Sequence, residues 1–138
     1  SAFRVGHAAL TTLRDGGYYG ADGKIAKLQA AWRAHCDKLV AEHPEFFSPV
    51  ADSTGRTSEN YVSGTGGMMR LTPFGGDRAT IMKALHALFH HGVIAFLCGH
   101  GPYHLRFLAP IGAMEPEHFE PIFDIMRTAF TSVVNDEA

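Results

Sequence analysis

The stretch GPYHLRFLAPI, residues 101–111, places a single cation, Arg106, inside an apolar run that a proline closes. Alternation along the strand that this run predicts puts Leu105 and Phe107 on one face, and His104 with Arg106 on the other. A buried arginine without an anion carries a large desolvation cost. We therefore expect Arg106 either to pair with a carboxylate, from the protein or from a ligand, or to lie on a solvated sheet face.

The residues before this strand predict a hairpin. Residues 93–98 are β-branched and aromatic, which favours a buried strand, and the turn at 99–102 joins it to the strand at 103–108. A better-defined strand is expected at 67–74, ending at a sheet margin because of Pro73. Two further short strands are expected at residues 46–50 and 60–62.

Four segments have the apolar spacing of amphipathic helices: residues 2–14, 22–43, 78–91 and 115–134. Asp77 has the character of an N-cap, and Pro116 occupies a first helical position. Because the strands pair locally and the helices are segregated, the sequence predicts an α+β fold. We expect an antiparallel sheet of three to four strands with helices packed on one face, preceded by one or two connecting helices.

Composition limits the classes of function. The chain has 138 residues, of which 46% are hydrophobic and 19% charged, with a net charge of −2. These values suit one small domain with a real core, and no basic run suggests a nucleic-acid partner. The apolar runs are too short to span a bilayer, so no membrane partner is expected. Cys36 and Cys98 are expected to be reduced thiols, which favours a cytoplasmic location.

The nine histidines raise the possibility of a metal site. Cys98, His100 and His104 have the spacing of half a zinc site, but no second pair follows at finger spacing. We therefore predict no metal ligands. A small metal-binding domain built on His100 and His104 remains an alternative.

Other catalytic arrangements fit less well. Cys98, in a predicted buried strand, is interpreted as a packing thiol rather than a nucleophile. The glycine pairs lack the spacing of a phosphate-binding loop. Arg70 is expected in an exposed or edge position, which leaves Arg106 as the candidate binding residue. The four lysines lie on charged helix faces and do not have the character of a Schiff-base lysine: Lys24, Lys27, Lys38 and Lys83.

The order of these segments resembles the C-terminal region of class III aminotransferases, which are pyridoxal-phosphate enzymes of fold type I. The matching residues include a glycine-led strand at 66–69, a Gly-Val-Ile segment at 92–94 and the segment 105–111 around Arg106. Residues 115–119 match the family's acidic helix start. Residues 8–14 and the helix through Trp32 and Leu39 resemble the family's connecting helices.

The resemblance implies an α+β small domain at residues 21–138, with residues 1–20 as a helix from the end of the cofactor (large) domain or its connector. It implies amino-group transfer from an amine or amino acid to a 2-oxo acid by the full-length enzyme, of the acetylornithine, ornithine, 4-aminobutyrate or lysine ω-transaminase kind. Arg106 would bind a substrate carboxylate. The partners implied are the large domain and a second subunit of a homodimer.

The resemblance also implies what this chain would lack. Pyridoxal 5'-phosphate would be bound by the full-length enzyme, and neither the Schiff-base lysine nor other catalytic or cofactor-binding residues would lie in this portion. The isolated chain is then expected to be inactive. The alternative, from another class, is a non-catalytic ligand-binding or regulatory module that uses its α+β sheet as an interaction surface.

Overall fold

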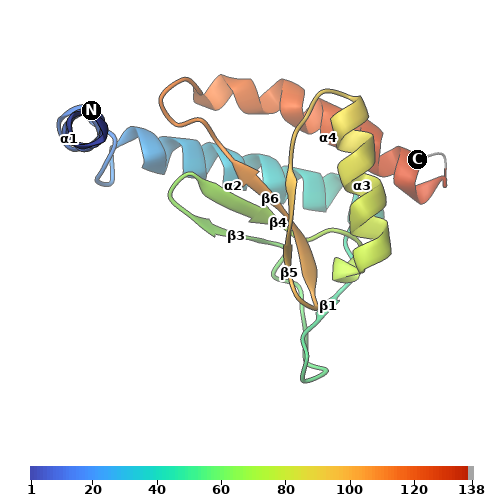
Figure 1. Cartoon of the computed structure of the whole chain (residues 1–138). Coiled ribbons are helices and arrows are strands. Elements are labelled where there is room, and N and C mark those ends of the chain that lie inside the picture. The colour runs from blue at the N-terminus through green and yellow to red at the C-terminus, as the bar shows by residue number, and fades with distance from the viewer. Residues whose placement is uncertain (137–138) are drawn as a thin grey trace.

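A computed structural model describes residues 1–136 of the chain (Figure 1). Its helices are α1 (Ala2–Asp15), α2 (Lys24–Glu42), α3 (Arg78–His90) and α4 (Phe119–Val134), with 3-10 turns η1 (Pro44–Phe46), η2 (Phe74–Gly76) and η3 (Pro116–His118). Its strands are β1 (Val50–Ala51), β2 (Thr57–Ser58), β3 (Val62–Thr65), β4 (Met68–Leu71), β5 (Phe96–Gly99) and β6 (Tyr103–Leu108). The four expected helices are all present.

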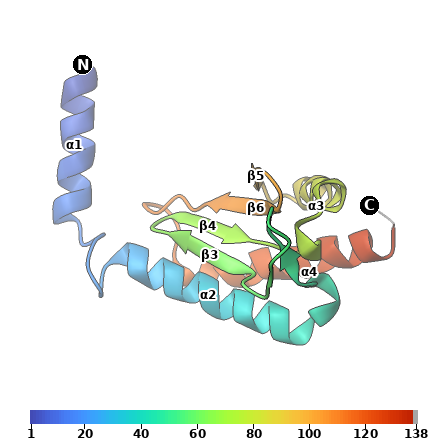
Figure 2. The same ribbon diagram turned by 90° about the horizontal axis from the view of Figure 1, so that it is seen from below.

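Four strands form the main sheet in the order β3-β4-β6-β5, and every neighbouring pair is antiparallel. The short strands β1 and β2 pair separately. Helices α2 and α4 lie along one face of the main sheet, as Figure 2 shows, and α3 packs against β5 and β6. The predicted α+β class, with an antiparallel sheet and helices on one face, is confirmed.

The core lies between the sheet and these helices. Met69, Leu71 and Leu105 point to the helices from the two inner strands and are at most 1% exposed. Trp32 of α2 meets them at the centre, with its ring centroid 4.9 Å from that of Phe107 and 5.2 Å from that of Phe123. Burial of these aromatic side chains supplies much of the stabilisation of the fold.

Local capping explains where two of the helical segments begin. The Asp77 carboxylate accepts hydrogen bonds from the backbone N–H and the hydroxyl of Thr80, at 2.9 and 2.7 Å. Before α4, the carboxylate of Glu115 accepts from the backbone of His118 while the His118 ring accepts from the Glu115 N–H. Both arrangements satisfy N–H groups that a helix start leaves free, so the N-cap expected at Asp77 is confirmed.

The prediction of a buried strand at 93–98 is wrong in position and in burial. The strand is β5, which begins at Phe96 and forms an edge of the sheet. Ile94 is 68% exposed and Phe96 is 44% exposed. An apolar run predicts burial, but helices cover only one face of this sheet, so side chains on its other face, such as Phe96, remain exposed.

The strand expected at 46–50 is also largely wrong. Pro44–Phe46 forms a 3-10 turn, and only Val50 of the expected segment is in a strand. Phe46 is 1% exposed because its ring lies edge-on to that of Phe130, with 5.6 Å between the centroids. Packing of Phe46 against α4 therefore determines the backbone conformation here. It overrides the strand propensity of Phe46 and Phe47.

Helix α1 stands apart from this core. None of its residues is buried, and Phe3 is 94% exposed. Figures 1 and 2 show the helix beyond the end of the sheet, joined by a loop to α2. In the part of the chain that the structure describes, no helix has the length and apolar character needed to cross a membrane.

Candidate functional site

The most distinctive feature of the sheet is a row of four side chains on the face opposite the helices. Strand register pairs Ser63 with Arg70, Arg70 with Arg106, and Arg106 with Phe96. Directly paired residues of antiparallel strands point to the same face. The row therefore runs across all four strands as a hydroxyl, two guanidinium groups and an aromatic ring.

The rest of this face is sparsely covered. Met68 and Leu108 are each about half exposed, at 52% and 50%, while Cys98 is half-buried. We use the term open face for this side of the sheet, defined by Ser63, Thr65, Met68, Arg70, Phe96, Cys98, His104, Arg106 and Leu108. Two expectations are corrected here: Cys98 is not buried, and Arg70 lies on an inner strand rather than at an edge.

Neither arginine has an anionic partner within residues 1–136. Both are half-buried, yet no carboxylate of the described residues forms a salt bridge with either of them. The Nε–H group of each is shielded from solvent and donates no hydrogen bond to any of the described groups. Because an unpartnered polar group costs free energy when it is shielded, these two N–H groups carry a cost that no described residue offsets.

The Arg106 guanidinium is held by an aromatic ring rather than by a carboxylate. Its Cζ atom lies 5.5 Å from the ring centroid of Phe96. A cation above an aromatic face gains modest stabilisation and keeps its hydrogen-bond donors free. This contact also explains why an apolar residue such as Phe96 is tolerated on the open face.

A shallow cavity lies over the two arginines. It has a volume of about 320 Å³ and is lined by Ser63, Gly64, Thr65, Met68, Arg70, Cys98 and Arg106. The lining joins two guanidinium groups with two hydroxyl groups and carries no carboxylate. This composition suits a small anion with hydrogen-bonding oxygens, since guanidinium groups bind carboxylate oxygens in pairs.

His104 lies on the same face but does not add a positive charge. Its Nδ1 atom is 2.8 Å from the hydroxyl of Thr72, which is 1% exposed. Burial, and then the charge of Arg70, lower the pKa of His104 below its ordinary value. The ring is therefore neutral at pH 7, and the Thr72 contact holds its orientation.

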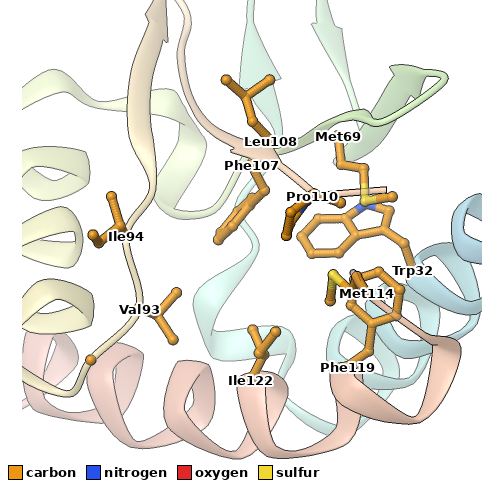
Figure 3. Close-up of a pocket in the computed structure, with 12 residues that line it drawn as sticks. Trp32, Met69, Val93, Ile94, Phe107, Leu108, Pro110, Met114, Phe119 and Ile122 are labelled. Carbon is orange, nitrogen blue, oxygen red and sulfur yellow. The ribbon is translucent and has the colours of Figure 1, made fainter. Parts of the chain in front are cut away.

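A second cavity lies on the helix side of the sheet. Figure 3 shows its apolar walls, which include Trp32, Phe107 and Phe119, around a volume of about 210 Å³. Its lining carries no charged side chain. The indole N–H of Trp32 has no hydrogen-bond partner among the described residues. The lining of this cavity includes no group able to carry out acid–base or nucleophilic chemistry.

The lysines do not fit a covalently bound pyridoxal phosphate. Lys24 forms a 2.7 Å salt bridge with Glu115, and Lys83 pairs with Asp136. Lys27 and Lys38 are exposed on α2, and no lysine lines the cavity over the arginines. A Schiff base needs an unprotonated lysine that reaches the substrate, so no step through this cofactor is assigned to residues of this chain.

The metal alternative finds no support in the geometry. Within residues 1–136, no group of three His, Cys, Asp or Glu side chains is placed to hold a metal ion. Cys98 and His104 are cross-strand neighbours, whereas His100 lies at the exposed tip of the hairpin. His104 instead uses one ring nitrogen for Thr72.

The sequence located Arg106 and its face correctly. Leu105 and Phe107 are buried toward the helices, while Arg106 lies on the other face, as alternation predicted. Sequence reasoning missed Arg70 as a member of the same site. The available signal was a second arginine in a strand with alternating burial, but only the strand order shows that the two face each other.

Comparison with known proteins bears on the fold. The sequence matches no protein-family model, and a search of curated proteins finds no match. Solved structures do match: lysine aminotransferase from M. tuberculosis in the internal aldimine form has a TM-score of 0.63 and 18% sequence identity, over 91% of this chain and 24% of that one.

A transaminase obtained by directed evolution through ancestral reconstruction matches with a TM-score of 0.66 and 20% identity, over 92% of this chain and 26% of that one. The chain thus spans about a quarter of the length of these structures. The expected resemblance in fold to a C-terminal portion of class III aminotransferases is confirmed.

Proposed function

We propose that this chain is the C-terminal small domain of a class III aminotransferase, and that Arg106 binds the carboxylate of the 2-oxo acid acceptor. The observation that carries the proposal is the open face, where Arg106 is half-buried and has no anionic partner among the described residues. The fold shared with lysine aminotransferase and with an engineered transaminase supports it.

The proposal gives the residues of this chain a binding role only. The guanidinium of Arg106 presents paired N–H donors, which match the two oxygens of a carboxylate and discriminate against an amine. The ring of Phe96 packs against the guanidinium group of Arg106. Pyridoxal phosphate, when bound by the remainder of the enzyme, supplies the amino-transfer chemistry. The lysines of this chain are all elsewhere, so the isolated chain is proposed to be inactive.

For Arg106 to bind a carboxylate in this role, the open face must be shielded from water by another part of the enzyme. Met68, Phe96 and Leu108 expose apolar surface on the open face. Apolar patches of this kind are typical of surfaces that pack against another domain or subunit. We propose that the large domain, in a homodimer of the full-length enzyme, lies over this side of the sheet and excludes water from the Arg106 site.

Two measurements test the proposal. In the longer protein that carries this domain, Arg106→Lys should raise the KM for the acceptor, because an ammonium cannot bind a carboxylate through two parallel hydrogen bonds. The KM for the amino donor should change little. Unchanged acceptor kinetics would show that Arg106 is structural.

The second measurement uses the isolated chain with added pyridoxal phosphate. No stable, lysine-dependent visible absorbance is expected after removal of excess cofactor. A stable internal aldimine in the isolated chain would contradict the proposal, since it would place the Schiff-base lysine among Lys24, Lys27, Lys38 and Lys83.

A non-catalytic ligand-binding or regulatory module is the second candidate. The observation that favours it is that the cavity over the arginines is formed by this chain alone. Both candidates predict anion binding at Arg106. Transamination by the longer protein separates them, because only the first candidate requires it.

A further inference from the structure

We propose that the cavity on the helix side of the sheet is a binding site for a small uncharged ligand with an aromatic ring. The inference goes beyond the proposed function, because this cavity is lined by Phe107 and lies on the opposite face of the sheet from Arg106. It gives the chain a second binding site, and a class of ligand that the open face does not suit.

The first argument is that the space reaches into the core and is not a flat apolar surface. Half of its lining residues are at most 9% exposed: Trp32, Met69, Val93, Phe107, Met114 and Phe119. Ile94, which is 68% exposed, borders the opening to solvent. A well-packed interior holds few voids larger than a water molecule, so an unfilled space among buried side chains is unusual.

The second argument is the size of the space and the nature of its walls. An apolar cavity of about 150 Å³ holds benzene, so the volume of about 210 Å³ suits one ring with a small substituent. Figure 3 shows Val93 across this space from Trp32 and Met114. The rings of Trp32 and Phe119 meet edge to face, with centroids 5.9 Å apart. A ligand ring gains further contacts of this kind, and the flexible thioether of Met114 adapts to its shape.

The third argument is that the lining disfavours charged ligands and polypeptide segments. No charged side chain lines the cavity, so a charged ligand would lose its hydration without gaining a counter-charge. The indole N–H of Trp32 is shielded from solvent and is not offered to a ligand. A polypeptide segment would bring backbone N–H and C=O groups that these side chains cannot pair. An uncharged molecule that is mostly hydrocarbon is the ligand that the walls suit.

The experiment uses the fluorescence of Trp32, which is the single tryptophan of the chain and lines the cavity. Iodobenzene, whose iodine quenches fluorescence on contact, should quench Trp32 with a saturable dependence on concentration. The compound 4-iodobenzoate adds a carboxylate to the same ring and should bind at least about tenfold more weakly, because its charge would lose hydration. Iodocyclohexane lacks the aromatic contacts and should also bind more weakly. Free iodide should have little effect, since Trp32 is 2% exposed.

Variants that fill the space assign the signal to this cavity. Ile122→Phe on α4 and Ala109→Leu after β6 each enlarge a lining side chain, so each should lower the affinity for iodobenzene about tenfold. Two such variants cover the case in which one does not fold. Ile125→Phe is the matched control, because Ile125 is also half-buried on α4 but does not line the cavity. Toluene should raise the unfolding midpoint of the unchanged chain and of the control, but not of the filled variants.

Several outcomes would overturn the inference. They are quenching by iodobenzene that does not saturate, binding of 4-iodobenzoate or iodocyclohexane as tight as that of iodobenzene, and unchanged affinity in both filled variants. Toluene should also raise the unfolding midpoint of the longer protein that carries this domain, and Ile122→Phe should remove the effect. No effect of toluene there would mean that another segment fills the cavity, which would overturn the inference as well. None of these results bears on Arg106, which lies on the other face of the sheet.

Discussion

The Nδ1 atom of His104 lies 2.8 Å from the hydroxyl oxygen of Thr72, and this contact ties β6 to the residue that follows β4. Both residues are buried, at 9% and 1% exposure. The contact anchors the open face just beside Arg70. It also places a titratable ring where protonation is unfavourable, which has a measurable consequence for stability.

We predict that the chain becomes less stable as the pH is lowered below about 6.5, because of His104. Its pKa is lowered in the folded state, first by burial and then by the charge of Arg70. The unfolded state, with an ordinary pKa of about 6.5, then binds more protons than the folded state below that pH. The contribution of His104 to the free energy of unfolding is therefore fully present above about pH 6.5. It is lost as the pH falls toward the pKa that His104 has in the folded state.

Urea denaturation of the chain and of His104→Gln between pH 5 and 7.5 checks this prediction. The variant should show a weaker pH dependence than the unchanged chain. Carboxylates whose pKa is lowered, such as that of Glu115, lose their contribution only at lower pH, outside this window. A ring titration of His104 by NMR with a midpoint at or above 6.5 would contradict it.

Removing Arg70 from the cross-strand pair should stabilise the isolated chain. Arg70 and Arg106 repel each other without a counter-charge among the described residues, and like charges in this position are destabilising. Arg70→Gln should raise the free energy of unfolding by about 0.2–1 kcal/mol at low salt, and the gain should shrink at high salt. Chemical denaturation at two salt concentrations measures it, with Arg4→Gln as the control. A loss of stability at both salt concentrations would refute it.

Gly76 is predicted to resist substitution because of the hairpin tip. Its φ is +74°, and a Cβ atom there would lie 2.6 Å from the Cβ of Pro102. Gly55 has a similar φ of +79° with no atom within 4 Å. Gly55→Ala should cost about 1–2 kcal/mol from the backbone conformation alone. Gly76→Ala should cost more, because it adds the clash. Equal thermal unfolding midpoints for the two variants would contradict the prediction, because they would show that the hairpin tip at Pro102 moves to relieve the clash.

Helix α1 is predicted to contribute little to the stability of the rest of the chain. None of its residues is buried, so its removal exposes no core surface. A chain that begins at Gly16 should unfold at nearly the same temperature as the full chain. Calorimetry of both tests this, and a clear decrease after truncation would show that α1 packs on the domain. An unchanged midpoint would support the proposed division at residues 1–20 and 21–138.

The helices could be predicted well because their signals are local. Asp77 and Thr80 define one helix start within a few residues, and Glu115 with His118 defines another. The edge strand could not be predicted in the same way. Phe96 has the same residue character on either face of a sheet, and only its pairing with Arg106 on the face that no helix covers leaves it exposed.

The candidate site divides in the same manner. The sequence by itself determined that Arg106 lies on a strand with Leu105 and Phe107 on the opposite face, since alternation is a property of one extended segment. Only the tertiary structure decided that Arg70 lies directly beside it. That depends on the strand order β3-β4-β6-β5 and on its register, which are decided by how the apolar faces of separate segments pack on α2 and α4.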